Sequence, residues 1–147
     1  MNTGQQVALE IIEGYLGERE IDGPRGNPII QRIIDKVMSE VDNNHHDDSS
    51  IAWCAIFMSY FFMRCGVVDK PIIAARKWNK VGTKVDDPQF GDIVIYWRYS
   101  VNDWRGHVGI YLRRVGDQIY TLGGNQSDAV TVTPYAASRL LEYRRID

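Results

Sequence analysis

The sequence predicts an α+β protein in which helices come first and antiparallel strands follow. Three observations support this class. Apolar residues recur with helical period up to about residue 65, short β-rich stretches follow from residue 93, and turn signals such as Gly116-Asp117 separate these stretches. Helices followed by a run of strands are typical of α+β domains. The 147 residues, 44% hydrophobic and 24% charged, are expected to form a single catalytic domain, residues 1–147.

Residues 1–50 are predicted to form a helical N-terminal part. An apolar stripe of helical period predicts a first helix over residues 4–17. A second helix is expected from Ile29 to Met38, because Asn27 before Pro28 is a capping pattern and the isoleucines that follow share one face. The polar stretch at residues 42–50 predicts a loop that ends in the capping residues Ser49 and Ser50.

Residues 51–147 are predicted to hold a buried helix and the sheet. The segment 51–65 is apolar on nearly all sides, which indicates a central helix that ends at Gly66. A short helix over 74–80 follows. Strands are expected at 93–97, 107–112, 118–122 and 129–133, with a tight loop at 123–125. A short helix over 134–141 and an edge strand over 142–146 complete the prediction.

Charge and hydropathy exclude several classes of protein. The net charge of −2 argues against a nucleic-acid binder, which usually has a basic face. The longest apolar stretch, residues 51–63, is shorter than the roughly 20 residues that cross a bilayer, so no membrane insertion is expected. The first ten residues do not resemble a secretory signal, so we expect synthesis in the cytoplasm. A monomer is the expected state.

Cys54 is the candidate nucleophile. It is predicted to lie in the first turn of the buried helix, where unpaired N–H groups and the helix dipole lower a thiol pKa and can hold an oxyanion. Cys65 lies 11 residues later, roughly 16 Å along the same helix, too far for a disulfide that needs Cα atoms within about 7 Å. The structural alternative for Cys54 is a small apolar core residue, and this alternative is favoured for Cys65.

His107 and Asn125 could complete a catalytic site with Cys54. His107 begins a predicted strand after Gly106, and a nucleophilic cysteine needs an imidazole to take its proton. Asn125 follows the strand expected to pair with that of His107, and an amide can orient the imidazole. The structural alternatives are a strand-end histidine and a turn asparagine in a left-handed conformation.

Two other clusters receive weaker predictions. Adjacent residues such as His45-His46-Asp47-Asp48 rarely point at one ion, so no metal site and no cofactor are expected. Aromatic residues precede His107 in the chain and could wall a substrate groove, although core packing and loop anchoring explain them equally well. These are Tyr96, Trp97, Tyr99 and Trp104.

Four segments together carry a family resemblance. They are Ala52–Phe57, Phe90–Val94, Gly106–Tyr111 and Leu122–Ser127, in this order, and the N-terminal piece from Leu16 to Ile29 belongs to the same pattern. The chain thus resembles the CHAP and NlpC-type peptidoglycan hydrolases, which are cysteine, histidine-dependent amidohydrolases/peptidases, and especially their small phage-associated members.

The resemblance implies a papain-like fold in which the nucleophile helix packs on an antiparallel sheet. Cys54 matches the family nucleophile and His107 the general base. Asn125 matches the third polar position, which varies within the family, and Gln126 is the alternative. No metal or cofactor is implied.

The implied substrate is peptidoglycan, cleaved at an amide of the stem peptide by an endopeptidase or an N-acetylmuramoyl-L-alanine amidase. The protein would act at the periplasm or cell wall, as a phage endolysin released through a holin or as a secreted antibacterial effector with an immunity protein. Two alternatives stay open. One is a papain-like deamidase, transglutaminase or acyltransferase on protein or lipid, and the other is a non-catalytic wall-binding module.

Overall fold

The structure, a computed structural model, describes residues 1–23, 25–42, 44–48 and 52–147. Helices α1 (Thr3–Gly14), α2 (Pro28–Met38) and α3 (Cys54–Arg64) come first, followed by the 3₁₀ helix η1 (Ala75–Lys80). The strands are β1 (Thr83–Val85), β2 (Ile93–Trp97), β3 (Gly106–Val115), β4 (Gln118–Gln126), β5 (Ala129–Ala136) and β6 (Leu140–Arg145), with the 3₁₀ helix η2 (Ala137–Arg139) between the last two. This confirms the predicted α+β class.

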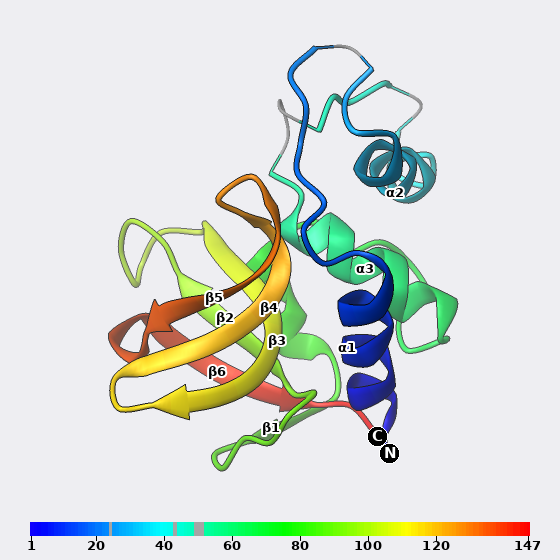
Figure 1. The fold of residues 1–147 in the computed structure, drawn as a ribbon. Helices are drawn as coiled ribbons and strands as arrows, with labels where there is room; N and C mark the ends of the chain where they lie inside the picture. The colour runs from blue at the N-terminus through cyan, green and yellow to red at the C-terminus, as the bar shows by residue number, and fades with distance from the viewer. Residues whose placement is uncertain (24, 43, 49–51) are drawn as a thin grey trace.

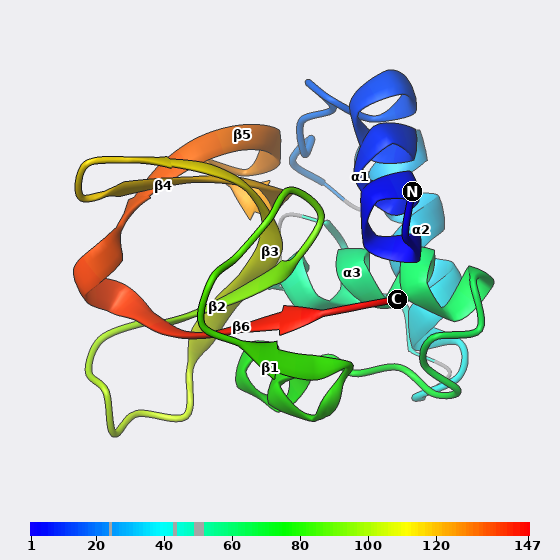
Figure 2. The ribbon, with the colours of Figure 1, turned by 90° about the horizontal axis from the view of Figure 1, so that it is seen from below.

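The strands form one antiparallel sheet in the order β1-β6-β2-β3-β4-β5. The sheet curls strongly, and the α-helices lie on one side of it, with α2 outside α3 (Figures 1 and 2). Helix α3 packs on β3 and β4, so the helix that begins with Cys54 lies against the strands that carry the other candidate residues. None of the helices in the described ranges is long and apolar enough to cross a bilayer.

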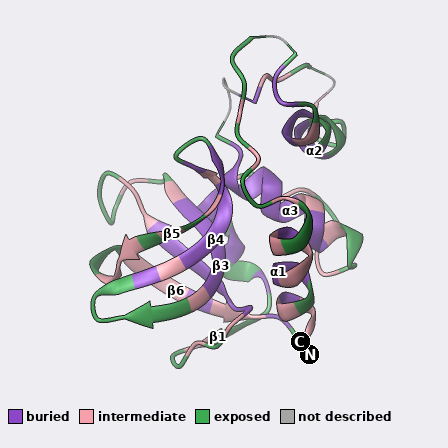
Figure 3. Cartoon of the chain, in the orientation of Figure 1, coloured by how far each residue is buried: buried purple, intermediate pink, exposed green. Residues whose placement is uncertain are grey.

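Helix α3 is buried along most of its length because the sheet, α1 and α2 surround it (Figure 3). Tyr15 of α1 makes edge contacts with Phe57 and Phe61 of α3, at ring-centre distances of 6.4 and 5.0 Å. A Cβ atom at Gly124 would lie 2.5 Å from the indole ring of Trp53, so this position of β4 must be glycine for the helix to pack closely. The core therefore fixes the start of α3 against the sheet.

The segment after α1 also holds the start of α3. Gly17 donates a backbone hydrogen bond to Val130 of β5, and Glu20 donates one to Asp128, the residue before β5, at 2.9 Å each. The carboxylate of Glu20 then accepts a 3.0 Å hydrogen bond from Nε1 of Trp53, the residue before Cys54. This contact links the segment after α1 to the start of the Cys54 helix, which explains why that segment is part of the family sequence pattern.

The helix boundaries agree with the sequence prediction in part. Asn27 caps α2 as predicted, since its Oδ1 accepts hydrogen bonds from the N–H groups of Ile29 and Ile30. Helix α1 ends at Gly14, three residues before the predicted end. Helix α3 begins at Cys54 with Trp53 as N-cap and no side-chain cap bond. The predicted caps at residues 49–50, and Ile51 at the predicted helix start, lie outside the described residues.

The predictions for the C-terminal part are wrong in four places. No pattern in the sequence indicates strand β1, and the predicted edge strand over 142–146 is β6, which lies inside the sheet between β1 and β2. The predicted tight loop at 123–125 is part of β4, and the predicted helix over 134–141 is the end of β5, the single turn η2 and the start of β6. Cross-strand pairing overrides local preference in both segments, and Pro134 is tolerated because β5 is an edge strand.

Candidate active site

Cys54 is the first residue of α3 and is 5% exposed. A pocket of about 200 Å³ opens onto it between residues 73–75 and the loop that joins β2 to β3. Burial raises the pKa of the thiol, although hydrogen bonds from the backbone N–H groups of Val108, Ala55 and Cys54 itself and the charge of Arg98 lower it. The predicted lowered pKa is therefore wrong for this structure, because removing the thiolate from water outweighs the donors at the helix start.

His107 is the second residue of β3, one of the strands on which α3 packs, and its imidazole is buried. The ring stacks on Tyr135 of β5, with centroids 5.0 Å apart and an interplanar angle of 27°. Tyr96 of β2 lies parallel at 6.3 Å. Burial lowers the pKa of His107 to about 4, and the Arg98 charge adds to this effect, while the hydrogen bond to Gln126 opposes it. His107 is therefore a neutral imidazole at neutral pH.

Gln126 determines which nitrogen of His107 carries the proton. Its Nε2 donates to the backbone oxygens of Thr121 and Thr131 at 3.0 and 2.8 Å, which leaves its Oε1 as an acceptor for Nε2–H of His107 at 2.9 Å. Nδ1 of His107 is then unprotonated. Within the described residues, this buried Nδ1 has no hydrogen-bond partner. An unpaired buried nitrogen of this kind can accept a proton from a thiol.

The structure places Gln126 and not Asn125 against His107. The register of β4 on β5 shifts between Gly123 and Gln126, so that β4 has one residue more than β5 over this stretch. Asn125 takes up this irregularity with φ 58°, the left-handed conformation of the structural alternative. Its role as third catalytic residue remains a prediction, and the geometry favours the alternative, Gln126.

The four aromatic residues before His107 separate into two groups. Tyr99 and Trp104 line the pocket and are 71% and 74% exposed. Tyr96 is buried, with its hydroxyl 2.6 Å from Oγ1 of Thr121. Trp97 is half-buried, and its Nε1 donates to the backbone oxygen of Ser138 at 3.2 Å. Of these four residues, Tyr99 and Trp104 are the two placed to contact a ligand in the pocket.

Two arginines that the sequence motifs do not include shape or line the pocket. Arg76 donates hydrogen bonds of 2.6 to 2.8 Å to the backbone oxygens of Ser100, Val101 and Arg105. These bonds hold the β2–β3 loop in one shape beside Cys54. Arg98 follows β2 and lines the pocket. No motif identifies these residues, because their proximity to Cys54 arises only from the fold.

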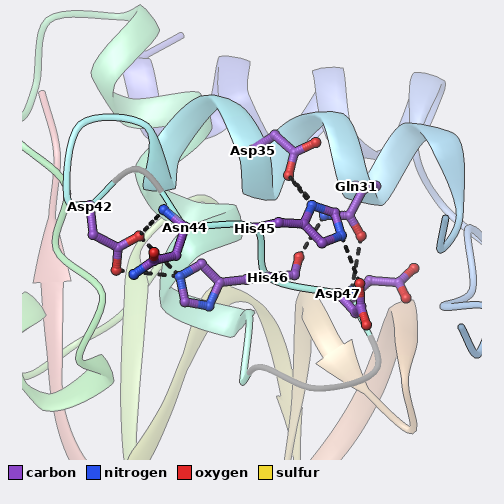
Figure 4. Close-up of polar contacts among 8 residues, drawn as sticks. Gln31, Asp35, Asp42, Asn44, His45, His46 and Asp47 are labelled. Carbon is purple, nitrogen blue, oxygen red and sulfur yellow. Dashed lines mark hydrogen bonds and ion pairs between the residues drawn. The ribbon is translucent and has the colours of Figure 1, made fainter. Parts of the chain in front are cut away.

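The histidine-rich loop, residues 44–48, lies beside α2 (Figure 4). Nε2 of His45 lies 2.7 Å from Oδ1 of Asp47, whereas Nε2 of His46 lies 3.1 Å from Oδ1 of Asp42. The two rings thus bind different carboxylates. In the described part of the chain, no three His, Cys, Asp or Glu side chains are grouped to hold a metal ion.

Comparison with known proteins identifies the family. Residues 46–125, more than half of the chain, match the family model of the CHAP domain. The chain therefore belongs to the CHAP domain family, which implies amidase or peptidase chemistry on peptidoglycan. Cys54 and His107 lie within the matched region, and Gln126 directly follows it.

Two further comparisons add little. No curated protein matches the chain. A similar solved structure is that of a lipoprotein-like protein of the NLP/P60 family from Staphylococcus aureus subsp. aureus Mu50, with 18% identity and a TM-score of 0.48 over 88% of this chain and 44% of that one. The chain thus spans less than half the length of that protein.

Proposed function

We propose that this protein is a cysteine amidohydrolase that cleaves an amide bond in or next to the stem peptide of peptidoglycan. Cys54 is the nucleophile, His107 the general base and Gln126 the group that orients His107. The observation that carries the proposal is the buried Nδ1 of His107, which is unprotonated and unpaired among the described residues and lies on β3, one of the strands on which the Cys54 helix packs. Membership of the CHAP family supports the choice of substrate.

The reaction begins when Nδ1 of His107 takes the thiol proton as the sulfur of Cys54 attacks the amide carbonyl carbon. The N–H groups of Cys54 and Ala55 at the start of α3 stabilise the oxyanion. The imidazolium then protonates the leaving amine, which leaves a thioester on Cys54. Water, deprotonated by His107, attacks the thioester and releases the acid with the free thiol.

Both groups are neutral before substrate binds. The pKa of the buried thiol is raised and that of His107 is lowered to about 4, so the thiol–imidazole form is favoured over the thiolate–imidazolium pair. Proton transfer then accompanies attack on the substrate. As the proton moves, Nε2–H of His107 binds Gln126 Oε1 more strongly, because hydrogen bonds to a charged group are the stronger ones.

The biological setting that we propose is the bacterial cell wall. A phage endolysin released through a holin and a secreted antibacterial effector both fit this chemistry. An effector would be encoded beside an immunity protein that binds it.

Digestion of purified peptidoglycan tests the proposal. The wild type is expected to release defined muropeptides with new amine termini, identified by mass spectrometry. Cys54→Ala should release none, while Cys65→Ala, the matched control at the exposed cysteine, should behave as the wild type. Circular dichroism and thermal unfolding would establish that both variants fold. Wild-type product yields from Cys54→Ala would refute the assignment of the nucleophile.

A further inference from the structure

The pocket that opens onto Cys54 has a positive lining. Arg98 and Arg105 both line it, and none of the described residues that line it carries a negative charge. Arg105 is largely neutralised, because its guanidinium makes two 2.9 Å contacts with the carboxylate of Asp103 and stacks on Tyr99 at 3.7 Å. Arg98, in contrast, is not neutralised by a carboxylate of any described residue.

Arg98 has no counter-ion in the described structure, in which no Asp or Glu carboxylate lies within 4.0 Å of its guanidinium. Its neighbour is the Tyr135 hydroxyl, whose pKa is raised by burial and lowered by the charge of Arg98 and its hydrogen bond. A neutral phenol does not balance a guanidinium. Arg98 and Cys54 line the same pocket, so a ligand in this pocket can contact both the cation and the thiol.

We propose that Arg98 forms a carboxylate-binding subsite in the pocket of Cys54. The guanidinium has a planar set of N–H donors that matches the two oxygens of a carboxylate, and half-burial strengthens such a pair. Tyr99 and Trp104 form the exposed rim of the subsite. A ligand that enters would place its carboxylate on Arg98 and its electrophilic carbon near the Cys54 sulfur.

The natural ligand of this subsite rests on the proposed function, and the subsite determines which amide substrates the enzyme prefers. The substrate would carry a free carboxylate close to the cleaved bond, as the stem peptides of peptidoglycan do. A carboxamide at the same position would lose the charge-assisted hydrogen bonds. Amidation of that carboxylate should therefore protect a wall fragment from cleavage.

Two alkylating reagents test the subsite without any cleavage. Iodoacetate and iodoacetamide differ only in a carboxylate and a carboxamide, and each forms a carbon–sulfur bond with a thiolate and releases iodide. At a given cysteine, the ratio of the two alkylation rates does not depend on the fraction of thiolate, because both reagents react with the same thiolate. Peptide mass spectrometry would give the ratio at Cys54 and at the exposed Cys65 of the same chain as internal reference.

The iodoacetate to iodoacetamide ratio at Cys54 is expected to be about tenfold higher than at Cys65 in the wild type. Arg98→Gln should reduce the Cys54 ratio to that of Cys65, and Arg98→Lys should keep part of the preference. Arg113→Gln removes a charge over Tyr120, away from the pocket, and should leave the ratio unchanged. Equal ratios at both cysteines in the wild type, or an unchanged ratio in Arg98→Gln, would overturn the subsite.

Wall fragments separate this inference from the proposed function. Cleavage of a carboxylate-bearing stem peptide at about ten times the rate of its carboxamide, with the preference lost in Arg98→Gln, supports both. Equal cleavage of both fragments by the wild type overturns the subsite and leaves the function standing. Cleavage of neither fragment, together with the expected alkylation ratios, overturns the function and leaves the subsite standing.

Discussion

The arrangement of His107 and Gln126 leads to a prediction that distinguishes two neighbouring residues. Gln126→Ala removes the acceptor of Nε2–H of His107, so the ring loses both its fixed orientation and its preferred tautomer. Asn125→Gly removes the neighbouring amide and keeps the left-handed backbone, which glycine adopts freely. We expect the first variant to lose activity and the second to keep it.

The size of the effect follows from the hydrogen bond that is lost. In the proposed reaction His107 becomes an imidazolium, and a hydrogen bond to a charged group contributes about 1.5–3 kcal/mol. Losing it in the transition state lowers kcat by about 10- to 100-fold, at about 1.36 kcal/mol per factor of ten. KM should change little, because Gln126 is buried behind the imidazole and does not line the pocket.

The assay is cleavage of a soluble stem-peptide fragment under steady-state conditions, at a temperature where both variants are folded. Gln126→Ala is also expected to lower the free energy of unfolding by about 1–3 kcal/mol, since it leaves buried polar groups unpaired. Urea denaturation would define the safe temperature. A Gln126→Ala enzyme with wild-type kcat, or an Asn125→Gly enzyme with the larger loss, would refute the reasoning.

Two further predictions concern stability. Burial lowers the pKa of His107 from 6.5 to about 4, so the unfolded chain binds a proton at this residue more readily than the folded protein does. The free energy of unfolding should therefore be highest above pH 6.5 and fall by about 3 kcal/mol toward pH 4. His107→Asn should flatten this slope in urea titrations, and equal slopes in both proteins would contradict the assignment. Asp92 is buried and accepts hydrogen bonds from Arg145 at 3.0 and 2.8 Å. Asp92→Ala should therefore lower the free energy of unfolding by about 1–3 kcal/mol, whereas Asp117→Ala at an exposed turn should not change it measurably.

Local patterns account well for the helices and for the site residues that begin regular elements. Asn27 caps α2, and the apolar residues around Cys54 form a buried helix, because capping and burial depend on neighbours within one or two turns. The ends of β4 and β5 were misjudged, since Gly123, Asn125 and Pro134 favour turns when taken alone. Their strand conformation comes from pairing with residues of other strands.

The third residue of the site and the pKa of Cys54 could not be derived from local pattern. Whether Asn125 or Gln126 meets His107 depends on one register shift between β4 and β5. A shift of one residue exchanges the faces of a strand, and no composition rule specifies it. The pKa of Cys54 depends on how completely the sheet and loop cover the helix start, and this cover outweighs the local dipole.

The sequence by itself determined the order of helices and strands and the family resemblance, and it indicated Cys54 and His107 as candidate residues, because each follows from a short local pattern. Only the tertiary structure decided that Gln126 accepts a hydrogen bond from Nε2 of His107, that Nδ1 is left unpaired among the described residues, and that Arg98 lines the same pocket as Cys54. These three features join elements far apart in the chain. Their geometry is specified by packing and strand register, which no single segment encodes.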